Sequence, residues 1–459
     1  MTTYNHTTFG QAKAQLAALL GDPSRTFWTD SELGLYLVEA LRVWSLGTCF
    51  HRATAQLTTS PGIAFYDIPS LALGIGGEPV QGYSVTDRQL IGEMLYHLME
   101  PQIMDWPGGW AGTEMFSLAE VVDTVAKGRE DLQRQTAAVV SQDRYVQSGG
   151  DQRVNLSPDL AYLRRASWQE DGQPLRRPIW PIDEHQAQTT SRSAIYPQPD
   201  QPKGYVLAST PELSMDLWPA PRNQGTVRTL EVKTGLALDP MTAAFSLQWP
   251  DDAAHLIKYR ALADLFAGDG LARAPQMAAY CEERVKVGVE MVKRYQSVLW
   301  ADLGGRMVTV SSLAQRDATT PGWESVPGMP KKLALPAWNL LALSPVPDQA
   351  YTITLEMVRR APIPQSDGDY LQVGREHLVA IYDYGQHLAM LKMQGAEFLE
   401  GAQGLLQSFL EAVSEARSKW AAETPTYWEL ERLGRLDRNW RPVWKMAADQ
   451  EAREEAAAV

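Results

Sequence analysis

The chain has 459 residues, of which 44% are hydrophobic, so it is long enough to form two or three domains with apolar cores. Its formal net charge is −13, which argues against a basic nucleic-acid-binding surface because acidic side chains repel phosphate. The two cysteines, Cys49 and Cys281, lie far apart and fit neither a zinc pattern nor a disulfide framework. Without a signal-peptide pattern or an apolar run of membrane-spanning length, the sequence predicts a protein that is made in a reducing cytoplasm and enters no membrane.

Residues 1–110 are expected to form a mainly helical N-terminal domain. An Ala- and Leu-rich segment over residues 8–20 predicts the first helix. A second helix is expected after Thr29, because Thr29 and Glu32 have the spacing of a capping box. In such a box the cap hydroxyl and the glutamate each bond to the other residue's backbone amide.

The rest of this N-terminal region repeats the same signals. A pair of strands is expected to end at Ile68, just before a proline. Thr86 and Gln89 form another capping-box pattern, which opens a helix over residues 90–99.

Residues 111–300 are expected to form the first helix/β/helix unit. Ser117 and Glu120 repeat the capping-box spacing, and Phe116 before Ser117 echoes the aromatic pair before Thr29. After the helix come a strand that ends near Pro158, a β-rich stretch over 159–245 and helices over 255–266 and 275–300.

Residues 301–420 are expected to form the second β/helix unit. Strands are predicted within 307–360, with a polar loop over 317–332, and a long helix or helix pair over 375–420. Residues 421–459 turn polar and are rich in Ala and Glu, which predicts a C-terminal tail that frays or folds on a partner.

A repeated phrase connects these two units. Leu213–Pro221 and Trp338–Pro347 each read as a strand followed by a Pro-x-Pro turn. Each is followed by Thr-Leu-Glu in a returning strand and then by His-Leu at a helix start, at an offset of about 122 to 126 residues. The sequence therefore predicts an α+β fold: a helical N-terminal region plus two duplicated β-sheet and helix units.

One set of residues resembles a catalytic site. Asp216 on one strand and Glu231-x-Lys233 on the next have the spacing of a metal-dependent nuclease, in which carboxylates hold Mg²⁺ and the lysine activates water. The second copy has Ala342 near the position of Asp216 and Val358 at that of Lys233. An exposed Glu and Lys on a strand face is the alternative that we favour.

No other pattern predicts chemistry. His255 and His377 open matching helices, but the residues four positions on are Tyr259 and Ile381, which are not a metal-binding pair. Nucleophile-elbow, phosphate-loop and zinc-protease motifs are absent from the sequence. We therefore predict a protein that is not an enzyme, with no catalytic residues, no metal ligands and no cofactor.

The pattern as a whole resembles the head-to-tail connector (adaptor or neck) proteins of tailed bacteriophage virions. The resemblance rests on three segments: Phe27–Trp44 with Phe65–Pro69, the two strand and Pro-x-Pro units, and the helix from His377 to Phe398. It implies a structural protein that forms a cyclic homo-oligomer, a twelve-fold ring by resemblance to the family. Such a ring contacts the portal and the tail or neck proteins, and it lines a passage for genomic DNA without reading its sequence. The resemblance also implies a location in the virion after synthesis in the bacterial cytoplasm.

Other interpretations of the function stay open from the sequence. The same pattern suits a tail-completion or fibre-anchoring protein, and an exposed strand edge would suit a soluble peptide-binding protein. Trp428, Trp440 and Trp444 in the tail are candidate partner-binding residues because tryptophan dominates many interfaces. The alternative is that these three side chains pack on the protein's own helices.

Overall fold

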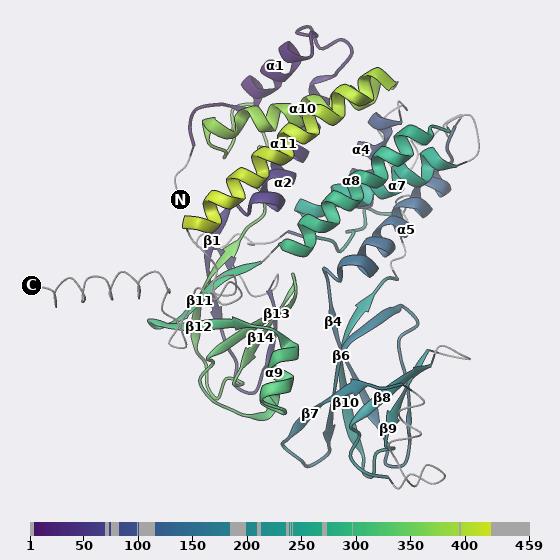
Figure 1. Cartoon of the computed structure of the whole chain (residues 1–459), viewed down its shortest axis with the longest axis vertical. Coiled ribbons are helices and arrows are strands. Elements are labelled where there is room, and N and C mark those ends of the chain that lie inside the picture. Colours follow the sequence, from purple (N-terminus) through teal and green to yellow (C-terminus); the bar gives the residue numbers. More distant parts are fainter. Residues whose placement is uncertain are drawn as a thin grey trace, which may run out of the picture.

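A computed structural model describes residues 4–68, 73–74, 82–98, 100, 115–183, 199–208, 213–235, 238, 240, 242–268, 273–295, 297–393 and 396–423. The fold is α+β, as the sequence predicts. Helices gather at one end of the molecule, and two β-sheets lie side by side at the other end (Figure 1). Within the described part of the chain, no helix is both long enough and apolar enough to cross a membrane.

One copy of the duplicated unit, which we name the inner copy, is continuous in sequence. Its elements in chain order are α5 (Leu118–Thr136), β4 (Ser141–Gln147), β5 (Arg153–Asn155), β6 (Leu160–Glu170), β7 (Arg176–Pro181), β8 (Gly204–Ala208), β9 (Ser214–Trp218), β10 (Gly225–Lys233), the short helix η1 (Asp251–Ala253), α7 (His255–Ala267) and α8 (Pro275–Arg294).

The other copy, which we name the outer copy, is split by the inner one. Its first part is α2 (Asp30–Thr48), β1 (Arg52–Thr58) and β2 (Phe65–Asp67). Its second part is β11 (Val298–Leu303), β12 (Arg306–Ser311), β13 (Lys332–Ala337), β14 (Leu340–Ser344), β15 (Thr352–Val358), the short helix η3 (Arg375–His377), α10 (Leu378–Met393) and α11 (Ala396–Glu423). Between β12 and β13 it adds α9 (Leu313–Thr319) and the short helix η2 (Trp323–Ser325). Helix α1 (Phe9–Leu19) precedes the outer copy and α4 (Asp87–His97) precedes the inner copy. These two helices match, because each has 11 residues and a full capping box, and their N-caps Thr8 and Thr86 bridge to Tyr370 and Ser246. Strand β3 (Leu73–Gly74) is added beside β1.

The strand order shows that the copies share one topology. The inner sheet runs β4-β10-β6-β7-β8-β9-β5, and the outer sheet runs β1-β15-β11-β12-β13-β14-β2, with β3 added beside β1. Each sheet has one parallel pair at the same place, β7 with β8 and β12 with β13, and its other pairs are antiparallel. The inner copy is therefore inserted into the outer copy, between its second and third strands.

The first helices of the two copies match in detail. Helices α2 and α5 are both 19 residues long, and their N-caps Thr29 and Ser117 each accept a hydrogen bond from the amide three residues on. Both helices end at a left-handed residue, Cys49 with φ 53° and Ala137 with φ 48°, which turns the chain into the following strand. The fold also has matching cis peptide bonds before Pro219 and Pro345.

The capping boxes are only partly as expected. Thr86 and Gln89 form the full reciprocal box at the start of α4. At Thr29 only half of the box forms, because Glu32 accepts hydrogen bonds from Tyr36 and Lys392 instead of from the cap amide. The Glu32 side chain is thus used in tertiary packing, which the local spacing does not reveal.

Strand pairing fixes which residues correspond between the copies. Four residues after the left-handed cap, Ala53 pairs with Met357 in the outer copy, and Ser141 pairs with Glu231 in the inner copy. Met357 and Glu231 are therefore structural equivalents, and so are the residues that precede them.

The repeated Thr-Leu-Glu phrase does not follow this register. It aligns Leu230 with Leu355, but the structure aligns Leu230 with Glu356. Leu355 packs inside the outer sheet's core, whereas Leu230 contacts the other copy. A slip of one residue reverses the two faces of a strand, so this part of the expected match is wrong.

Packing crosses the expected boundaries at 110 and 300. Helices from all three expected regions share one apolar core that includes Trp44, Trp249, Tyr259, Tyr384 and Phe409. Each sheet has a separate apolar core of its own. The packed bodies are therefore a shared helical body and two sheets, and no body is continuous in sequence except the inner sheet.

Other local expectations need correction. Strands β1 and β2 do not pair with each other, because β14 pairs with β2 and β15 pairs with β1. The helix expected to continue to Trp300 ends at Arg294, and Trp300 lies in β11. The polar loop expected over 317–332 begins within α9 and contains η2.

Candidate functional site

The three residues of the nuclease hypothesis are not brought together. Asp216 lies on β9, and Glu231 and Lys233 lie on β10, but β6, β7 and β8 separate these strands in the sheet. Asp216 is paired with Arg153, whose Nε lies 3.0 Å and whose second nitrogen lies 3.2 Å from the two carboxylate oxygens. This two-point contact satisfies the carboxylate that a metal would need.

Glu231 is buried inside the inner sheet and has structural partners. Its Oε1 accepts hydrogen bonds from Tyr145 Oη at 2.8 Å and Thr229 Oγ1 at 2.6 Å. Lys233 Nζ lies 2.9 Å from Asp143 and 3.6 Å from Glu231. Burial opposes the charged form of this lysine, but the hydrogen bond with Asp143 raises its pKa above the ordinary value, so it stays protonated and cannot serve as a base near neutral pH.

The histidines expected at helix starts are packing residues. His255 is buried, and burial lowers its pKa to about 3. His377 packs beside Trp44, with ring centroids 4.8 Å apart. Across the residues that the structure describes, no group of three or more His, Cys, Asp or Glu side chains is placed to hold a metal ion. Trp428, Trp440 and Trp444 lie outside the described residues.

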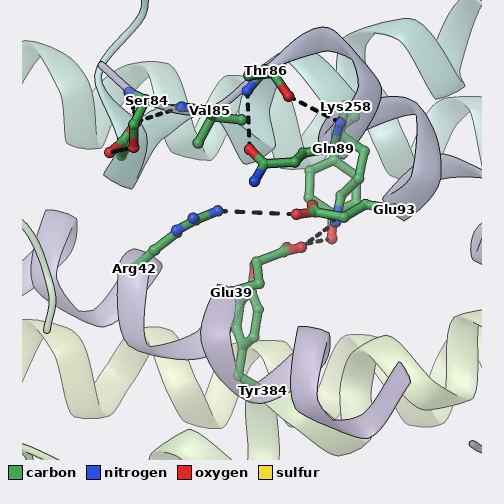
Figure 2. Close-up of polar contacts among 11 residues, drawn as sticks. Glu39, Arg42, Ser84, Val85, Thr86, Gln89, Glu93, Lys258 and Tyr384 are labelled. Atoms are coloured by element: carbon green, nitrogen blue, oxygen red, sulfur yellow. Dashed lines mark hydrogen bonds and ion pairs between the residues drawn. The ribbon is translucent and has the colours of Figure 1, made fainter. Parts of the chain in front are cut away.

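The most concentrated polar cluster lies in the helical core and joins the two copies. Glu39 of α2 accepts hydrogen bonds from Lys258 and Tyr259 of α7 and from Tyr384 of α10. Lys258 also lies 3.4 Å from Glu93 of α4. Figure 2 shows Glu39, Glu93 and Lys258 converging between these helices. Although burial favours the neutral acid, the Lys258 ammonium holds the pKa of Glu39 well below its usual value.

The cluster continues along α8. Arg284 donates to Tyr384 and contacts His387 of α10, and Tyr280 also bonds to His387. His387 is fully buried, and burial together with Arg284 lowers its pKa well below the ordinary value. These hydrogen bonds again connect the inner copy's α8 with the outer copy's α10.

Asp251 ties the start of α7 to the segment before α4. Its carboxylate accepts from the backbone amides of Ser84 at 2.7 Å and Val85 at 2.9 Å, and from the Ser84 hydroxyl at 2.7 Å. Arg42 of α2 and Glu93 of α4 form a longer pair at 4.0 Å (Figure 2). These contacts hold Ser84, Val85 and α4 against Asp251 of the inner copy and against α2 of the outer copy.

A second buried ionic cluster joins the two sheets. Arg165 of β6 in the inner copy pairs with Asp317 at 2.6 Å and also with Glu324, both in the outer copy. Arg176 of β7 pairs with Glu324 at 3.1 Å. Burial opposes its charge, yet the two carboxylates raise the pKa of Arg165. Its guanidinium also stacks near the Trp323 ring, 5.7 Å from the centroid.

The copies meet through different faces. In the helical body, Glu39 of the outer copy is buried at the contact, but its equivalent ten residues after the N-cap in α5 is Lys127, which pairs with Asp123 at the surface. In the sheets, Arg165 pairs with Leu230, and the equivalent Trp300 pairs with Glu356. Arg165 is buried at the contact, whereas Trp300 is 38% exposed. The contact is therefore heterologous, without a two-fold axis.

Comparison with protein-family models finds no match to this chain. Comparison with curated proteins finds no sequence relative. The interpretation of the site therefore rests on the residues and geometry described above.

Sequence patterns gave little sign of these two clusters. A signal was present at Glu39, which interrupts an apolar helical face that includes Tyr36, Leu37 and Ala40. A charged residue on such a face is rarely buried unless it is paired. Its partner Lys258, however, lies more than two hundred positions away, so the sequence did not identify the pair.

Proposed function

We propose that this chain is a structural protein of a tailed-phage particle that forms a ring at the head-to-tail junction. The observation that carries the proposal is the heterologous contact between two copies of one unit. Subunits of a cyclic ring meet in this way, each through two different faces. The net charge of −13 suits a ring that lets DNA pass without holding it.

The polar side chains support a scaffold more than a catalyst. Four charged side chains are buried in contacts between the copies, and each has a partner there. Glu39 pairs with Lys258, Arg165 pairs with Asp317, and Arg284 donates to Tyr384. Asp216 and Glu231 lie on strands that do not pair. Nothing in this arrangement favours the metal-dependent nuclease over a structural role.

The expected partners follow from the connector role. They are further copies of the chain, a portal protein on one side and tail or neck proteins on the other, with genomic DNA in the passage. The protein would be made in the host bacterial cytoplasm and built into the virion. A tail-completion or fibre-anchoring station in the same particle is the runner-up.

The test is reconstitution with the portal. The purified full-length chain, alone and mixed with the portal of the same phage, is imaged by negative-stain microscopy and fractionated by size. Rings that co-migrate with the portal are expected, and an intact chain that binds neither portal nor tail would overturn the proposal. DNA incubated with Mg²⁺ or Mn²⁺ should stay uncut; cleavage that is lost in Glu231→Ala would establish the nuclease instead.

A further inference from the structure

Each copy uses one surface in the contact between the copies. The equivalent surface of the other copy is left exposed, so the molecule has two such exposed surfaces. On the outer copy this face is the outer surface of β11, β12 and β15. Trp300 and Met307 lie there, 38% and 40% exposed, on the opposite side of the sheet from Ala301 and Val308, which belong to its core. The equivalent surface of the inner copy is the one that carries Arg165 into the contact. We name this the Trp300 face.

On the inner copy the matching face is the exposed side of α5. Lys127 and Arg134 project from it in ion pairs with Asp123 and Glu130, at 2.6 Å and 2.5 Å. The equivalent surface of the outer copy is the side of α2 that carries Glu39 into the contact. We name this the Lys127 face. In Figure 1 the strands β11 and β12 lie on the left of the molecule and α5 lies on its right.

We propose that the side of one chain that carries the Trp300 face docks on the side of the next chain that carries the Lys127 face, in the way that the two copies dock within a chain. This inference rests on the proposed function, because it specifies how the ring is built. The chain already contains one heterologous contact, and repeating the same rotation between chains generates a ring when that rotation closes and an open filament when it does not. Each chain then supplies two quasi-equivalent positions.

The chemistry of the Trp300 face fits a protein partner. An exposed tryptophan beside a methionine is a typical anchor for a protein interface. The neighbouring ion pair between Arg52 and Glu356, at 3.7 Å, lies on strands β1 and β15 of the same sheet. The partner is a second copy of this chain, because the contact inside the chain already shows what the equivalent surface binds.

In such a ring the ratio of structural positions to chains is fixed, and it can be measured. A ring of this kind has twice as many structural positions as chains, so the twelve positions implied by the family resemblance would need six chains. Native mass spectrometry gives the number of chains, and rotational averaging of ring images gives the number of positions. A ring whose images show one position per chain would overturn the inference.

Two single-face variants test the docking directly. Trp300→Glu removes one face, and Lys127→Glu with Arg134→Glu alters the other; each alone should raise the concentration needed for assembly at least about tenfold. Mixed in equal amounts, the two variants retain one intact pair of faces. They should therefore form two-chain complexes in sedimentation velocity but no rings.

Val146→Glu is the matched control, because Val146 of β4 is 61% exposed and the equivalent Thr58 of β1 is exposed as well. It should assemble like the wild type. Circular dichroism and hydrogen exchange check that each variant keeps the fold. Normal rings from Trp300→Glu, or a mixture of variants that stays monomeric, would refute this docking and leave a connector role intact. A correctly docked ring that ignores the portal would instead refute the connector role.

Discussion

Glu39 of α2 and Lys258 of α7 form a buried ion pair, although they belong to different copies of the duplicated unit. Their side chains are 5% and 2% exposed, so neither charge is solvated by bulk water. Removing two charges from water costs free energy that is recovered only while both partners remain. The pair therefore makes the correct docking of the copies a condition for stability.

Glu39→Ala should destabilise the protein by about 3 to 5 kcal/mol, because it leaves the Lys258 ammonium buried without its main partner. Urea unfolding measures the change. The double substitution Glu39→Leu with Lys258→Met should recover most of the loss, since it removes both charges and keeps the volume.

Lys127→Ala is the control for this pair, because Lys127 occupies the position of Glu39 in the inner copy. Its pair with Asp123 is exposed, with side chains 62% and 61% accessible. The unfolding free energy of the isolated chain should stay close to that of the wild type, because solvent screens an exposed pair. A loss as large as that of Glu39→Ala would show that burial does not govern these pairs.

Arg165→Ala should separate the two sheets more than it unfolds either one. It leaves Asp317 and Glu324 as buried carboxylates, with Arg176 as the remaining cation near Glu324. Removing one partner from a buried cluster costs about 3 to 5 kcal/mol. Hydrogen exchange should accelerate in α9 before it does in the core strands.

Arg153→Ala provides the comparison for this variant. Arg153 makes the same kind of two-point contact, with Asp216, but its side chain is 54% exposed. The unfolding free energy of Arg153→Ala should stay close to that of the wild type, because solvent screens this pair. Equal exchange rates in α9 for wild type and Arg165→Ala would contradict the role of Arg165 as a link between the sheets.

The structural register gives a third prediction. Glu231→Met places in the inner copy the residue type that Met357 has at the equivalent position, but it leaves the hydroxyls of Tyr145 and Thr229 without their acceptor, so it should cost about 1 to 3 kcal/mol. Leu230→Glu places a charge in the apolar contact with Ala337 and Leu340 of the outer copy and should cost several kcal/mol. Thermal unfolding of the two variants measures both losses, and a loss for Leu230→Glu no larger than that for Glu231→Met would contradict the placement of Leu230 in the contact between the copies.

How much the sequence predicted depends on the range of the interactions. The N-caps at Thr29, Thr86 and Ser117 depend on residues three positions away, and helices begin at all three. The repeated proline turns likewise predicted equivalent strands before and after them, β9 with β10 and β14 with β15, but the expected pairing is wrong, because other strands lie between them in each sheet. The nesting escaped prediction because the outer copy's β2 and β11 are separated by the whole inner copy, so its first helix and strands looked like a separate N-terminal domain.

The candidate site was harder to predict for the same reason. Burial of Glu39 and Arg165 is decided by the docking of one copy on the other, and no local pattern encodes that docking. Asp216 and Glu231 lie on strands that are consecutive along the chain, which predicted that they would be neighbours. Strands β6, β7 and β8 intervene in the sheet, and chain order does not show this.

The buried histidines predict that acid weakens the fold. Burial lowers the pKa of His51, His97 and His255 to about 3 in the folded protein, against about 6.5 when unfolded. The unfolded chain thus binds more protons between these values, so stability is full above pH 6.5 and is lost as the pH falls toward 3. Each histidine should cost about 2 kcal/mol between pH 6.5 and 5, and His97→Phe should reduce the measured slope of unfolding free energy against pH.

Asp252 should act in the opposite direction. It is buried in η1, and burial raises its pKa to about 7 even though Arg42 and the Ala361 amide oppose the shift. The folded protein therefore holds a proton that the unfolded chain releases near pH 4, and this contribution is lost as the pH rises from about 4 to 7. In Asp252→Asn the contribution is gone, so the stability of the variant relative to wild type should rise across that window, by up to about 4 kcal/mol. A relative stability that stays flat from pH 4 to 8 would mean that Asp252 is ionised in the fold.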